Sequence, residues 1–280
     1  MKEKAILSEE TLNRILLNSI YPIIEEQYQK RINKYIEQLN LKNNIIFKLT
    51  EGNLFDIYAT TNDNTNFEIH FSKSSIDFIM QIAKQLEDTY IKQTLFKTED
   101  NVSNFIFAVI IDFIFHHEFT HIVRGHFIEN KESFFNSFSN IDLLEEVDAD
   151  FYATLFTIIF AEQKYKHFKS DNEILYHTTI FQSIIKFFNE INSLNPNAKR
   201  KDHPLPLERI IYFNNLYLFA IKYKKDLIKD LEGLKKSFLI NLYSLIKDNP
   251  KYDFNKKEID KLWLEYSNLT KHIDLDLLRI

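Results

Sequence analysis

A five-residue segment near the middle of the chain has the residue types and the spacing of a metal site. Residues 117–121 read His-Glu-Phe-Thr-His. On a helix, side chains four residues apart lie on one face, so His117 and His121 can bind one ion. Glu118 then lies near enough to reach a water on that ion. This is the arrangement of zinc hydrolases, in which two histidines bind zinc and the glutamate is the general base.

A catalytic zinc also needs a third protein ligand. In one class of zinc protease a later glycine and histidine mark its source, but Gly125 and His126 each miss the required position by one residue. The acidic segment 145–150 is the other source. Glu146 and Asp150 share a helical face, so we predict Glu146 as the ligand. Asp150 then accepts the second N–H of a ligating histidine.

Several neighbouring residues have alternative interpretations. Glu145 competes with Glu146 as the ligand, and Asp148 is expected to cap a helix or face solvent. His126 either supports a ligand or caps the end of the metal-binding helix. His177 is expected on the surface.

A third segment, residues 203–210, contains two prolines that stiffen the approach to a helix. His203 can donate a hydrogen bond to the oxyanion that develops on an attacked carbonyl. Arg209 can either pair with a carboxylate or bind substrate. Standing alone, this segment would be read as a rigid loop before a helix.

Taken together and in this order, the three segments resemble the gluzincin metallopeptidases. They are most similar to the HtpX and CaaX-protease branch and to its soluble relatives, the minigluzincins and the Lit phage-exclusion peptidases. The resemblance covers about residues 116–210. It implies that the zinc ligands are His117, His121 and Glu146. The catalytic residues would be Glu118 and His203, and the supporting residues would be Asp150, Arg209 and His126.

The elements that must position these residues are mostly helices. Periodicity predicts helices over residues 8–39, 74–96, 100–124, 139–166, 170–193 and in two or three pieces over 207–278. Strand candidates at 45–49, 54–58 and 67–71 predict a small three-stranded antiparallel sheet, with a hairpin turn at 51–53. We expect the strand at 67–71 to present an edge to an extended substrate.

The predicted fold class is therefore mostly α with this small sheet, an α+β arrangement. We expect one metallopeptidase domain over residues 1–280. Its parts are an N-terminal helix, sheet and helix (1–98), a zinc-site core with a gluzincin-like fold (99–210) and additional C-terminal helices (211–280).

Composition excludes several other classes of protein. The 280 residues include only three glycines, far apart, so neither a dinucleotide-binding fingerprint nor a P-loop is present. The net charge of -5 argues against a nucleic-acid partner, and the absence of cysteine excludes thiolate metal sites. The first ten residues lack a signal core, and no apolar run is long enough to span a bilayer, so we expect a cytoplasmic protein.

The function predicted from these features is a soluble zinc metalloendopeptidase. Its partners would be a protein or peptide substrate and, as one means of restraint, an activating peptide or protein. The resemblance to the Lit peptidases adds phage defence as an expectation. The alternative is a binding or regulatory module on a peptidase scaffold that senses a partner without turnover, although an intact Glu118 speaks against it.

Overall fold

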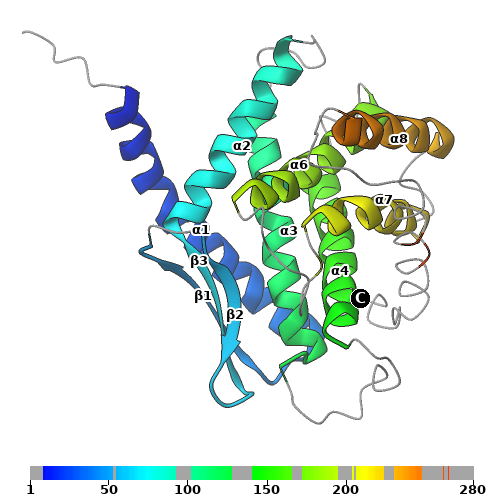
Figure 1. Cartoon of the computed structure of the whole chain (residues 1–280). Coiled ribbons are helices and arrows are strands. Elements are labelled where there is room, and N and C mark those ends of the chain that lie inside the picture. The colour runs from blue at the N-terminus through cyan, green and yellow to red at the C-terminus, as the bar shows by residue number, and fades with distance from the viewer. Residues whose placement is uncertain are drawn as a thin grey trace, which may run out of the picture. The chain divides into compact units, whose positions relative to one another are not determined.

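Helices make up most of the described chain and are accompanied by one small sheet (Figure 1). The structure is a computed structural model and describes residues 9–52, 55–92, 102–127, 141–165, 172–194, 204, 206–223, 230–247, 261 and 264. The helices are α1 (Glu9–Leu39), α2 (Lys73–Lys92), α3 (Val102–Arg124), α4 (Ile141–Lys164), α6 (Glu173–Leu194), α7 (Pro206–Tyr223) and α8 (Leu231–Lys247). The strands are β1 (Asn44–Thr50), β2 (Ile57–Thr61) and β3 (Asn66–Ser72). The α+β class is thus confirmed.

The sheet is mixed, so the predicted antiparallel meander is wrong. Its order is β1-β3-β2, with β1 parallel and β2 antiparallel to β3. The tight turn lies between β2 and β3, where the Asp63 carboxylate accepts backbone N–H bonds from Thr65 at 2.9 Å and Asn66 at 2.7 Å. β1 and β2 are not paired with each other, so the predicted hairpin between them is wrong. In the parallel register, Phe47 lies beside Ile69, and both are buried on one face of the sheet.

The position of β3 also overturns its expected role as a substrate-binding edge. It is the central strand and is hydrogen-bonded to a neighbour on both sides. The outer side of β1 is covered by α1, because the Gln29 side chain accepts a bond from the Phe47 N–H (2.9 Å) and donates one to the Ile45 carbonyl (3.1 Å). Such side-chain bonds block further strand pairing at β1.

The chain divides after Phe78 into two compact units. The first contains α1, the sheet and the start of α2, where the Ser72 hydroxyl caps the helix by accepting the Ser75 N–H at 3.1 Å. Ser72 is therefore the capping residue of α2. The single-domain organisation over 1–280 stays a prediction.

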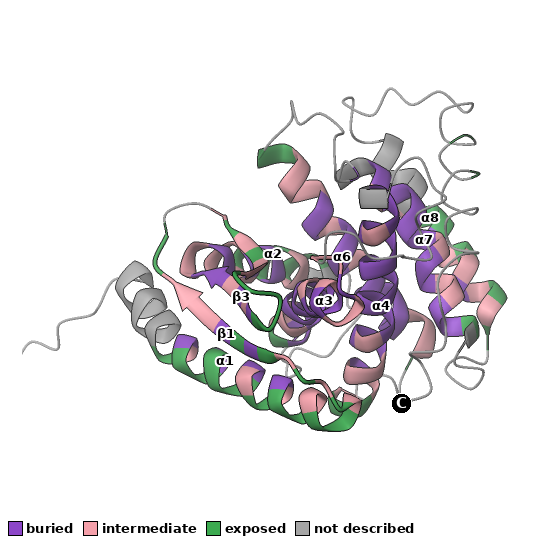
Figure 2. Cartoon of the chain, turned by 90° about the horizontal axis from the view of Figure 1, so that it is seen from below, coloured by how far each residue is buried: buried purple, intermediate pink, exposed green. Residues whose placement is uncertain are grey.

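In the second unit, α3 packs against α4 and α6, and α7 packs against α4 and α6 in turn. Most residues of α3 and α4 are buried (Figure 2). By length and composition α3 could cross a bilayer, but 72% of its apolar window is buried inside the protein, as in a core helix. Ala149 and Ala153 of α4 are fully buried, and small side chains allow two helices to approach closely.

Candidate metal centre

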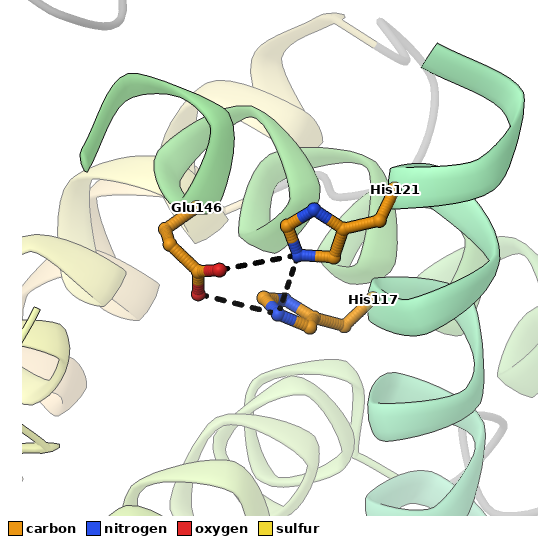
Figure 3. Close-up of side chains that lie close together, drawn as sticks. All are labelled: His117, His121 and Glu146. Atoms are coloured by element: carbon orange, nitrogen blue, oxygen red, sulfur yellow. Dashed lines mark hydrogen bonds and ion pairs between the residues drawn. The ribbon is translucent and has the colours of Figure 1, made fainter. Parts of the chain in front are cut away.

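Three potential ligands converge where α3 passes α4 (Figure 3). One turn of α3 separates His117 from His121, and their Nε2 atoms lie 3.1 Å apart. Glu146 of α4 places Oε2 3.4 Å from Nε2 of His117 and Oε1 3.3 Å from Nε2 of His121. Two nitrogens and a carboxylate, all within 4.8 Å of one another, form a group that could hold a metal ion. The structure thus brings together the three residues that the sequence predicted as ligands.

The His117 side of the cluster is supported by a carboxylate. Nδ1 of His117 lies 2.8 Å from Oδ1 of Asp150, which is fully buried one turn after Glu146. This is the predicted position for a group that orients a ligating histidine. The hydroxyl of Tyr212 on α7 donates a hydrogen bond to the other oxygen of Asp150.

Arg209, on the same helix as Tyr212, holds two carboxylates at once. Its Nη2 donates to Glu146, and its Nε lies 3.3 Å from Asp150. The guanidinium also lies over the ring of Phe188, 5.5 Å from its centre. Of the two roles open to Arg209, the structure shows pairing with carboxylates.

The His121 side has a different support. Nδ1 of His121 lies 2.8 Å from Nδ1 of His126, just beyond the end of α3. Nε2 of His126 lies 3.5 Å from Asp148, and Asp148 accepts a 2.7 Å bond from Nε of Arg124. Asp148 is only 1% exposed and lies inside α4, so the expectation that it faces solvent or caps a helix is wrong.

Comparison with known families bears on this cluster directly. The sequence model of the Peptidase U49 family matches residues 59–224, more than half of the chain. The chain belongs to the Peptidase U49 family. The comparisons with curated proteins and with solved structures give no match. The matched segment of this U49 peptidase contains all the residues of the cluster and of its two supports.

Electrostatics of the U49 site favour a cation among its carboxylates. Burial by itself would lower the pKa of His117, but the charges of Asp150 and Glu146 outweigh burial and raise it to about 10. Burial likewise opposes ionisation of Glu146, yet Arg209 and His117 hold its pKa well below the ordinary value. Burial lowers the pKa of His126 to about 4, so its imidazole is neutral near pH 7.

The remaining predicted site residues are placed as follows. Glu118 follows His117 on α3, is partly exposed, and is one of the carboxylates whose charge raises the pKa of Arg209 against the effect of burial. Glu145 is partly exposed and is not part of the ligand group. His203 lies outside the described residues, so its expected role stays a prediction.

Sequence reasoning missed Tyr212, Arg124 and the role of Asp148. Tyr212 lies three residues after Arg209 and so on the same face of a helix, which is a signal that could have found it. Arg124 and Asp148 belong to different helices, and only the packing of α3 against α4 pairs them.

Proposed function

We propose that this U49 peptidase is a zinc-dependent metalloendopeptidase. The observation that carries the proposal is the convergence of His117, His121 and Glu146, within a segment that matches a peptidase family. Two histidines and a carboxylate, with a fourth position for water, are a common ligand set of catalytic zinc.

The spacing of the ligand atoms supports zinc. Zinc binds nitrogen and oxygen at about 2.0–2.2 Å in a tetrahedron, whose ligand atoms are then about 3.3–3.6 Å apart. The Nε2 atoms of His117 and His121 are 3.1 Å apart, and each lies 3.3–3.4 Å from a different oxygen of Glu146. Neither histidine would need a large movement to share one ion.

Bound zinc would supply Lewis acidity and lower the pKa of a coordinated water towards about 7. The remaining steps belong to the chain. Glu118 accepts the proton of the attacking water and delivers it to the leaving amine. Arg209 and Asp150 hold Glu146 and His117 in place, and the burial of both carboxylates limits competing water. His203 remains our candidate for a hydrogen bond to the oxyanion.

We also propose a cytoplasmic location, a protein or peptide substrate and a role in phage defence. The role in phage defence rests on the resemblance of the three sequence blocks to the Lit peptidases. The substrate class rests on the match to a peptidase family, and the location on the expectation drawn from the sequence. An activating peptide or protein partner is consistent with the need to restrain a protease in that compartment.

The test is a comparison of Glu118→Gln with wild type in a cell lysate, read as newly formed protein N-termini. We expect Glu118→Gln to keep stoichiometric zinc and to lose at least about 100-fold in cleavage, because a general base typically contributes 10²–10⁴-fold. Glu190→Gln, on α6 and paired with Lys186, is the matched control and should cleave normally. Equal cleavage by Glu118→Gln would overturn the mechanism, and zinc binding without any wild-type cleavage would favour the binding-module alternative.

A further inference from the structure

The two proposed histidine ligands contact different partners, and the partner of His121 is another histidine. We infer that His126, backed by Asp148 and Arg124, is a positioning residue that fixes the ring and the tautomer of His121. This inference rests on the proposed metal site. We call these three residues the His126 support. Asp150 is the corresponding group for His117.

The backbone beyond α3 places His126 against its target. Gly125 has a φ of 68°, and its N–H bonds to the Ile122 carbonyl at 3.0 Å. The N–H of His126 bonds to the carbonyl of His121 at 2.9 Å. These two bonds form a Schellman motif, which turns the chain back over the last helical turn. His126 therefore returns to the side chain of His121, five residues earlier.

The short contact between the two rings determines where the protons lie. A histidine that binds a metal through Nε2 carries its proton on Nδ1. Nδ1 of His121 lies 2.8 Å from Nδ1 of His126, and two nitrogens this close share one proton. With His121 as the donor, His126 must accept at Nδ1 and carry its own proton on Nε2.

The far side of His126 matches that arrangement. Its Nε2 faces Asp148 Oδ2 at 3.5 Å, and the side chain of His126 is only 5% exposed. Asp148 is fixed by the 2.7 Å bond from Arg124, whose guanidinium lies 5.5 Å from the centre of the Tyr152 ring. Asp148 is itself held by an ion pair with Arg124, and its negative charge favours a proton on the facing Nε2. In the opposite tautomer of His126, an unprotonated Nε2 would face the carboxylate of Asp148.

The two supports differ in charge. Asp150 brings a negative charge next to His117, and this charge increases the basicity of the ligand. The imidazole of His126 contacts His121, while the charge of Asp148 behind it is balanced by Arg124. We expect loss of the His126 support to weaken zinc binding by about 10–100-fold, the range for loss of a group that orients a ligand.

The test measures zinc affinity of the full chain by competition with a chelator. His126→Phe keeps a ring but removes the acceptor, and should show the full loss. His126→Asn places an amide oxygen near the position of Nδ1, so it should recover most of the affinity. His177→Phe is the matched control, because it removes a fully buried imidazole outside the metal centre and should bind zinc as wild type does.

A second measurement uses the wild-type protein alone and reports the tautomer of His126. Nitrogen-15 NMR of the zinc-bound wild type should show His126 as the Nε2–H tautomer, which distinguishes positioning from simple packing. A proton on Nδ1 of His126, or wild-type zinc affinity in His126→Phe, would overturn this inference and leave the proposed function intact. If the wild type binds no zinc, the metal assignment and this inference both fail.

Discussion

Two clusters in the second unit bury a histidine beside a carboxylate and a tyrosine, and only one of them is arranged to bind a metal. At the first, His117 lies among His121, Glu146, Asp150 and Tyr212. At the second, fully buried His177 has Nδ1 3.1 Å from the hydroxyl of Tyr217 and Nε2 3.7 Å from Glu162. The expectation that His177 lies on the surface is wrong.

Both clusters bury a histidine, but they differ in whether several donor atoms point at one place. In the first cluster, three donor atoms point at one place, and each ligand is held from behind by a further polar group. In the second, the two nitrogens of one imidazole face two separate neighbours. Among the described residues, His117, His121 and Glu146 are the group with metal-ligand geometry. A buried histidine becomes a ligand candidate only when a second and a third donor share its target.

The largest expected effect is loss of the carboxylate ligand. Glu146→Gln should weaken zinc binding by more than about 100-fold, which is the upper value for residues that only support a ligand. Glu162→Gln makes the same change beside His177 and should leave zinc affinity unchanged. Both are measured by chelator competition. If the two variants lose affinity equally, the distinction between the clusters is wrong.

Removal of the support behind His117 should have the next largest effect. Asp150→Asn keeps the shape of the side chain but removes the charge beside Nδ1 of His117. We expect zinc affinity to fall about 10–100-fold and cleavage to fall with it. Circular dichroism would establish that the variant is folded. Unchanged affinity in the folded variant would remove Asp150 from the site.

Zinc binding should depend on pH because His117 must lose a proton. The pKa of His117 is raised to about 10, so the metal-free imidazole is protonated near pH 7, whereas a ligand must be neutral. Apparent affinity should therefore rise with pH, by up to about tenfold per unit below that pKa. Calorimetry at pH 7.5 in buffers of different ionisation enthalpy should detect release of a proton. If Asp150→Asn released as many protons on zinc binding as wild type, Asp150 would not be the cause of the raised pKa of His117.

The last comparison concerns the stability that two buried tyrosines contribute. Tyr212→Phe removes a bond to a charged acceptor, Asp150, and should cost about 1.5–3 kcal/mol of unfolding free energy. Tyr217→Phe removes a contact with an imidazole and should cost about 0.5–1.5 kcal/mol. Denaturant unfolding of the metal-free protein measures both. A larger loss of unfolding free energy for Tyr217→Phe than for Tyr212→Phe would contradict the expected order of the two hydrogen bonds.

Much of the helical unit could be predicted because its signals are local. The spacing of His117 and His121 places both on one face of α3, and that helix ends at Arg124 as expected, directly before Gly125. The same periodicity relates Glu146 to Asp150 on α4. The existence of a three-stranded sheet could be predicted, but the order and direction of its strands could not, because parallel pairing of β1 with β3 depends on residues far apart in the chain.

The sequence by itself determined which residue types are available and which of them share a helical face. Only the tertiary structure decided their partners. Packing of α3 against α4 made Glu146 rather than Glu145 the third member of the cluster and buried Asp148 beside Arg124. Packing of α7 against α4 directed Arg209 to Glu146. The reason is physical: helical periodicity repeats every few residues, whereas a buried charge is stabilised by groups that the whole fold must bring to it.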